Sequence, residues 1–233
     1  PVWRGRTVCA IAAAAVTLAC SHPTPAPAPS ASAPDGLTAT TLTVPEGLAG
    51  APLDTPRKAL VPLGWSISVW ARVPKARLSV WAPDATLLVS VPAEGRVLRL
   101  SPAQDGGASS VLLDNLNQPH GLWFAGATLY VAEGDRIVGY QYDAGQVSDR
   151  RVLAAGLPDA RSPELGGAYA HALKSVAVGP DGAVYFSIGS TGNISASDRT
   201  ASPPRATIMR IPPDGGPPAP FARRSARPRR RPS

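Results

Sequence analysis

The sequence predicts an all-β fold built from one recurring unit of short antiparallel strands. From about Leu78 onward, runs of alternating apolar and polar residues are separated by short turns rich in Gly, Asp and Pro, which is the pattern of strands joined by hairpins. The same order of run, turn and run occurs three times. Long helices are not expected after the first twenty residues, because the chain contains 27 Pro and 22 Gly.

The three units share one internal order. Each begins with an alternating run, passes a short turn, and continues with a β-branched and aromatic run and then a third run of similar character. The turns are Pro83-Asp84, Ala125-Gly126 and Pro180-Asp181-Gly182. The central runs "LLVS", "LYVA" and "VYFS" start at Leu87, Leu129 and Val184, 42 and then 55 residues apart. The first spacing is that of a four-stranded propeller blade, about 40 to 50 residues, and the second leaves room for an insertion.

These spacings favour a β-propeller over residues 61–220, with about three blades present; a β-sandwich made of similar hairpins is the alternative. Propellers bind ligands over their central channel, where the ends of the inner strands meet the connecting loops. His120 and His171 each lead into the first run of their unit, so we expect both at the rim of this channel. The alternative for each histidine is that it caps a strand by satisfying backbone groups.

The first 60 residues predict export rather than folded structure. Arg4 and Arg6 precede an apolar run that ends at Cys20, as in a signal peptide over residues 1–20, and the run is too short to span a membrane as a helix. "TLAC" resembles a lipobox, so Cys20 is the expected site of lipidation, with an ordinary cleaved signal or an apolar helix as alternatives. Residues 21–60 begin as a Pro/Ala/Ser-rich tether and continue as an irregular lead-in. We therefore expect an exported protein, at the cell surface or in the periplasm, attached to the membrane through this lipid.

The net charge of +7 is concentrated at the C-terminal end. Six of the 23 basic side chains lie in residues 221–233, "FARRSARPRRRPS", which leaves 17 basic against 16 acidic side chains elsewhere. A terminal basic run without interleaved aromatic residues is weak evidence for binding to nucleic acid, and we expect no such partner. The Arg/Pro-rich composition instead suggests a frameshift in GC-rich DNA.

Residues 77–216 resemble the glucose/sorbosone dehydrogenase family, and in particular its L-sorbosone dehydrogenase-like branch. The segments that carry the resemblance are "VPKARLSVWAPDATLLVSVPAEGRVLRL", "LNQPHGLWFAGATLYVAEGDRIVGY" and, most specifically, "HALKSVAVGPDGAVYFSIGSTGN" followed by "ATIMRIPPDGG". The resemblance covers the N-terminal half of such a protein and implies a six-bladed propeller that oxidises a sugar with pyrroloquinoline quinone (PQQ) and Ca²⁺. The sugar and the electron acceptor are not specified by these residues.

The resemblance also implies roles for individual residues. His171 aligns with the general base, which takes a proton from the substrate hydroxyl while hydride passes to the quinone; the ordinary pKa of histidine, about 6.5, suits this role. The loop with Gly189, Thr191 and Asn193 is implied to lie near the cofactor, with Asp198 and Arg199 further along the loop. No ligands for calcium are identified.

Two departures from the family pattern bear on activity. Three units are present where the family has six blades, and "PAPFAR" is followed by an arginine run instead of the "RGLRN"-like segment whose side chains approach the quinone. Two further hypotheses therefore stay open. One is a lactonase-like or NHL-like propeller hydrolase, for which Glu133, Asp135 and Asn193 offer metal ligands without a defined spacing. The other is a surface-anchored binding propeller without enzyme activity.

Overall fold

The computed structural model describes residues 35–100, 109–165, 167 and 169–223. Within these ranges the regular elements are strands and four short 3-10 turns, at Glu46–Leu48, Pro92–Glu94, Pro163–Leu165 and Ser197–Arg199. The prediction of an all-β fold is confirmed. No helix in this part of the chain is long and apolar enough to cross a membrane.

Twelve strands form three four-stranded antiparallel sheets, each in chain order. The first sheet is β3 (Ser79–Trp81), β4 (Leu87–Val91), β5 (Arg96–Leu100) and β6 (Ser109–Leu113). The second is β7 (Gly121–Ala125), β8 (Thr128–Ala132), β9 (Ile137–Asp143) and β10 (Gln146–Ala154). The third is β11 (Val176–Val178), β12 (Val184–Ile188), β13 (Thr207–Ile211) and β14 (Ala219–Arg223). Three successive sheets of this kind are three blades of a β-propeller, as the repeats predicted.

The three predicted turns join the first two strands of each sheet. Ala85, Gly126 and Gly182 adopt positive φ values of 61°, 57° and 74° at these turns. In the first sheet Asp84 accepts hydrogen bonds from the Thr86 N–H (3.2 Å) and hydroxyl (2.6 Å), which is why a polar Pro-Asp pair forms this turn.

The hydrophobic core lies between neighbouring sheets in two clusters. One joins the first and second sheets and includes Leu88, Val97, Leu129 and Val138. The other joins the second and third sheets around Phe186 and its neighbours. Because side chains alternate between the two faces of a strand, each sheet directs apolar side chains into one or both of these clusters. Neighbouring sheets therefore pack face to face rather than pairing through their edges.

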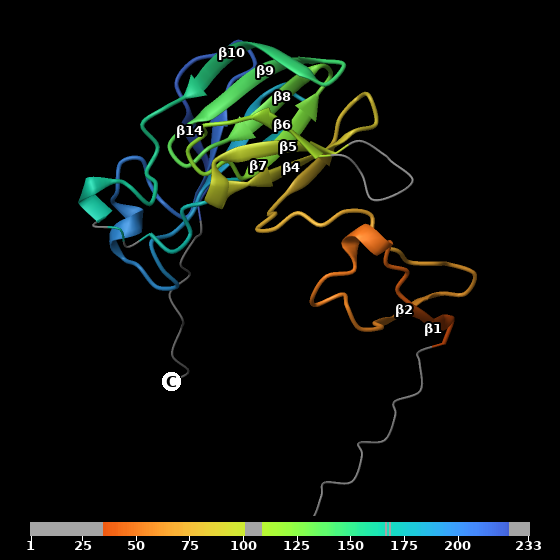
Figure 1. Ribbon diagram of the computed structural model, residues 1–233. Helices are drawn as coiled ribbons and strands as arrows, with labels where there is room; N and C mark the ends of the chain where they lie inside the picture. The colour runs from red at the N-terminus through yellow and green to blue at the C-terminus, as the bar shows by residue number, and fades with distance from the viewer. Residues whose placement is uncertain (1–34, 101–108, 166, 168, 224–233) are drawn as a thin grey trace, which may run out of the picture.

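The lead-in contains a hairpin that the sequence did not indicate. β1 (Leu37–Thr41) pairs antiparallel with β2 (Lys58–Pro62), apart from the three sheets in Figure 1. The chain then returns to the first sheet, where Trp70 packs against Trp81 with ring centroids 5.9 Å apart. This return segment lines a cavity together with Leu87 and Val89 and so covers part of the outer face of the first sheet.

The last described strand extends past the predicted domain boundary at residue 220. In β14, Ala222 pairs with Ile208 and Arg223 pairs with Thr207 of β13. The predicted signal peptide, Cys20 and most of the Arg/Pro-rich tail lie outside the described residues.

Candidate functional site

The candidate residues gather at one end of the sheets. Because strands alternate in direction, the turn between the second and third strands of each sheet lies at the same end as the link that enters the next sheet. His120 belongs to the link between β6 and β7, and His171 to the link between β10 and β11. The Gly189–Asn193 segment begins the long connection from β12 to β13 at this same end. The expectation that these residues share one rim agrees with the topology.

His171 and the Gly189 loop are in direct contact. The Ala170 N–H donates to the Thr191 carbonyl (3.1 Å), which joins the two segments. A Cβ atom on Gly189 would collide with the carbonyl oxygen of His171 and lie 2.9 Å from its Cβ, so only glycine permits this approach. His171 itself is exposed to solvent. The structure therefore brings together a solvent-facing imidazole and the loop with which the sequence associated it.

Asp198 organises the loop from inside. This residue is buried, and its carboxylate accepts hydrogen bonds from the Thr191 N–H and hydroxyl (3.0 Å each) and from Arg205 Nε (2.8 Å). Burial raises the pKa of the Asp198 carboxyl, but the Arg205 guanidinium and the Thr191 donors outweigh it and hold the pKa below its ordinary value. Asp198 thus anchors this loop, and both donor groups of Thr191 are used in hydrogen bonds to it.

The outer end of the loop is open. Asn193 is exposed, Gly192 has open space where a Cβ would lie, and Ile194 is 98% exposed. Arg199 is exposed as well. Asn193 is therefore an exposed polar side chain of this segment, whereas Gly189 and Thr191 shape and support the segment.

His120 is engaged by the backbone of the next blade. Its Nδ1 lies 3.0 Å from the carbonyl oxygen of Lys174, which requires a proton on that nitrogen. Burial lowers the pKa of His120, and the nearby charge of Arg77 lowers it further, whereas this hydrogen bond raises it. The histidine is half-buried directly before β7. These contacts match the alternative that His120 caps a strand.

Lys174 is a structural residue that sequence reasoning did not single out. Its side chain is fully buried, and Nζ donates to the carbonyl oxygens of Gly134 (at 2.5 Å), Pro158 (2.6 Å) and Ala172 (3.0 Å). Its own carbonyl accepts the Gly121 N–H at 2.9 Å. Burial lowers the pKa of Lys174 to about 8, against the attraction of Asp159 and Asp135. This lysine ties the second sheet to the link that enters the third sheet.

Tyr169 completes the support of the site. Its hydroxyl donates to the Gly189 carbonyl (3.0 Å), and the Lys174 ammonium lies 5.7 Å from the ring centroid. Burial raises the pKa of the Tyr169 hydroxyl to about 12. An isolated tyrosine in a polar link carries no sequence pattern that predicts this contact.

The carboxylates considered for a metal-dependent hydrolase are not assembled into one site. Glu133 accepts the Asn117 N–H (2.8 Å), Asp135 is paired with Arg136 (2.6 Å), and Asn193 lies in the loop of another blade. Burial raises the pKa of Glu133, although the hydrogen bond from the Asn117 N–H and the charge of Arg136 lower it in part. Within the described ranges no group of three His, Cys, Asp or Glu side chains is placed to hold a metal ion.

The described residues provide only part of what the binding of PQQ and calcium requires. PQQ is an acidic quinone and calls for cationic side chains, while calcium calls for six to eight oxygen ligands. Of the two arginines in the loop, Arg205 is paired with Asp198 and Arg199 is exposed. The described residues therefore supply an exposed imidazole and a polar loop, but no calcium site is found among them, and we assign no reaction step to the cofactor.

No family model matches the sequence, and no curated protein matches it either. Solved structures do resemble it. The PQQ domain of pyranose dehydrogenase from Coprinopsis cinerea is 22% identical, with a TM-score of 0.53 over 66% of this chain and 37% of that one. A carbohydrate-active enzyme of family AA12 from Trichoderma reesei is 18% identical, with a TM-score of 0.51 over 77% and 39%.

A gluconolactonase from Xanthomonas campestris is 22% identical, covering 68% of this chain and 52% of that one, but its TM-score of 0.41 is too low to carry an argument. At these identities the likeness shows the fold alone: the chain is a partial β-propeller. It spans less than two fifths of the length of the two structures with the higher scores.

Proposed function

We propose that this chain is the base-bearing part of a propeller enzyme that oxidises a sugar, or a related alcohol or aldehyde, with PQQ as acceptor and calcium as its partner ion. The L-sorbosone dehydrogenase-like branch is part of the proposal. The observation that carries it is the contact between the exposed His171 and the Gly189–Asn193 loop at the rim of the sheets. The likeness to a PQQ domain and to an AA12 enzyme supports the proposal at the level of fold.

His171 would act on the substrate hydroxyl. An unprotonated imidazole nitrogen at the surface can accept the hydroxyl proton, which prepares the adjacent C–H bond to release hydride. When bound, the quinone supplies the acceptor for that hydride. The protein's contribution is to fix the backbone that carries the imidazole, through the Ala170–Thr191 hydrogen bond and the tight Gly189 contact.

Dye-linked oxidation of sugars tests the proposal. The assay uses this chain and, in parallel, the longest reading frame that contains it, each supplied with PQQ and Ca²⁺. Turnover that requires added quinone is expected for the longer protein, and His171→Ala should lower kcat by at least about 100-fold, the usual contribution of a general base. Quinone binding, followed by absorbance, should stay within about twofold.

Three outcomes would contradict the proposal. Turnover unaffected by His171→Ala would remove this residue as the base. Hydrolysis of a lactone without any quinone would favour the propeller hydrolase, and binding of sugars without turnover of any kind would favour a surface-anchored binding propeller.

Export and lipid attachment through Cys20 are part of the same proposal. Cys20 follows the apolar run that the sequence predicts as a signal peptide. Expression in a bacterial host with an alkyne-labelled palmitate should label the protein, and Cys20→Ser should abolish the label. Retention of the label in Cys20→Ser, or no label on either protein, would contradict this assignment.

A further inference from the structure

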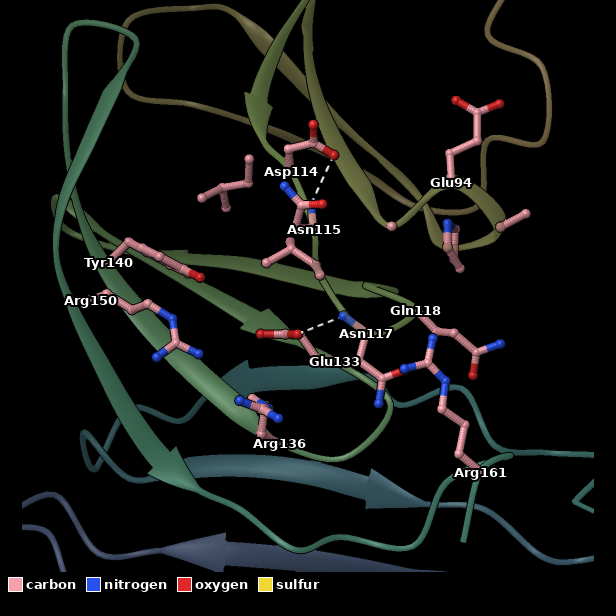
Figure 2. A pocket seen from close by; sticks show the side chains of 15 residues that line it. Glu94, Asp114, Asn115, Asn117, Gln118, Glu133, Arg136, Tyr140, Arg150 and Arg161 are labelled. Carbon is pink, nitrogen blue, oxygen red and sulfur yellow. Dashed lines mark hydrogen bonds between the residues drawn. The ribbon is translucent and has the colours of Figure 1, made fainter. Parts of the chain in front are cut away.

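A polar cleft lies between the first and second sheets, at the same end of the sheets as His171. It has a volume of about 830 Å³, within the range of small-molecule sites, roughly 300 to 1,000 Å³. Its walls come from the β4–β5 and β8–β9 turns, the links that follow β6 and β10, and strands β9 and β10. Neither His171 nor the Gly189 loop lines it. Figure 2 shows the side chains that line this cleft, with Glu133 and Asn117 near its centre.

Three buried acceptor atoms in this cleft have no hydrogen-bond partner. Among the described residues, four buried side-chain nitrogen or oxygen atoms are unpartnered, and three of them are Glu133 Oε1, Asn117 Oδ1 and Gln118 Oε1. Glu133 is only 3% exposed, and its other oxygen accepts the Asn117 N–H (2.8 Å). Figure 2 shows the free carboxylate oxygen on the side of Tyr140 and Arg150. Buried acceptors are rarely left without donors, so the cleft fits a ligand that donates several hydrogen bonds.

The same cleft also offers donors. Arg150 and Arg161 line the cleft and have no ion-pair partner within the described residues. Arg136 also lines it, but two of its nitrogens are bound to Asp135. A ligand for this cleft must therefore accept hydrogen bonds from arginine and also donate hydrogen bonds to carboxylate and amide oxygens.

A polyhydroxylated neutral molecule meets both demands, because each hydroxyl group donates and accepts. A simple anion would meet the buried Glu133 carboxylate, and a metal ion would meet the arginines, so neither fits the whole cleft. We propose that this cleft binds a neutral saccharide, with Glu133, Asn117 and Gln118 accepting its hydroxyl protons and Arg150 and Arg161 donating to its oxygens. The site is separate from the proposed function and does not depend on it.

Ligand-observed saturation-transfer NMR on the full 233-residue chain tests this site. The probes are maltose, cellobiose and lactose, with gluconate and glucose 6-phosphate as anionic comparisons. Saturation transfer to at least one neutral disaccharide is expected. Arg150→Ala and Gln118→Ala should each weaken its binding about tenfold or more, a loss of about 1.4 kcal/mol by the affinity relation.

Arg151→Ala is the matched control. Arg151 is the next residue of β10 and equally exposed, but it lines a different cavity with Gly182 and Val184. It should leave saccharide binding unchanged. Binding of the anions alone, no binding of any disaccharide, or equal effects of Arg150→Ala and Arg151→Ala would overturn the proposal.

Discussion

Lys174 stabilises the junction of two blades as a buried cation held by carbonyl groups. A lysine without solvent contact is costly unless its ammonium is fully hydrogen-bonded, and here three carbonyl oxygens from different segments surround it. Lys174→Met keeps the side-chain length and removes the donors, leaving three buried acceptors without a partner. The free energy of unfolding should fall by about 3 kcal/mol or more, measured by urea denaturation at pH 7. Lys58→Met, at an exposed position of β2, should change it by less than about 0.5 kcal/mol.

The same lysine predicts a pH dependence of stability. Its folded-state pKa of about 8 lies below the ordinary value of 10.5, so between these values the unfolded chain binds the proton more fully than the folded chain. The contribution of Lys174 to the free energy of unfolding is therefore lowest below pH 8 and rises with pH, by up to about 1.4 kcal/mol per pH unit. Denaturation between pH 7 and 10 should show this rise in the wild type but not in Lys174→Met. Parallel curves for the two proteins would contradict it.

Substitution of Gly189 tests the backbone contact between this residue and His171. An added Cβ would strike the His171 backbone, so Gly189→Ala should lower the free energy of unfolding by about 1 to 3 kcal/mol, as overpacking commonly does. The resonances of the His171 imidazole should shift in the NMR spectrum. Gly192→Ala is the control in the same loop, because its Cβ would enter open space, and it should leave both quantities nearly unchanged.

At the scale of elements, the connection between β12 and β13 is ordered by one buried carboxylate. Asp198→Ala removes the acceptor of Thr191 and leaves the guanidinium of Arg205, which is 12% exposed, without its partner. We expect the loop to open locally, with a loss of about 2 to 4 kcal/mol in the free energy of unfolding. Trypsin should then cleave after the exposed Arg199 much faster than in the wild type, as followed by mass spectrometry. Asp214→Ala, in the exposed turn before β14, should leave that cleavage rate unchanged.

The inner strands of each sheet could be predicted from the sequence, and the outermost strands could not. β4, β8 and β12 bury much of their length, so they carry the apolar and β-branched runs from which the repeats were recognised. β10 is exposed at most of its positions, β6 has no buried residue, and β14 contains Pro220 and leads into the arginine run. Outer strands pack little of their surface and therefore leave no apolar pattern.

Part of the candidate site could likewise be predicted from the sequence, and part could not. The resemblance paired His171 with the Gly189–Asn193 segment, and the fold places them in contact. The anchoring roles of Lys174 and Asp198 could not be predicted, because their partners are backbone groups and side chains that become neighbours only through tertiary structure. Likewise, the cleft around Glu133 is formed by two blades and has no local sequence pattern.

At the scale of the whole molecule, the two end sheets differ in how their outer faces are covered. The first sheet is overlaid by the return segment around Trp70, and Val89 is 5% exposed as a result. On the third sheet, Met209 and Ile211 face the core, whereas Ile208 on the same strand points outward and is 45% exposed. Phe221 of β14 is 62% exposed and contacts Tyr185 edge-on at 5.0 Å. The outer face of the third sheet therefore presents apolar side chains to solvent.

This face predicts self-association of the isolated 233-residue chain. An uncovered apolar sheet face with a strand at its edge favours pairing with a second copy. Sedimentation velocity at increasing concentration should show species larger than the monomer, and Ile208→Lys combined with Phe221→Lys should shift them toward the monomer. Trp65→Lys, which removes an apolar side chain that is 69% exposed in the lead-in, should not. Association that is unchanged by the double substitution but abolished by Trp65→Lys would assign the contact to the lead-in instead. The outer face of the third sheet would then not be the surface through which the chain associates.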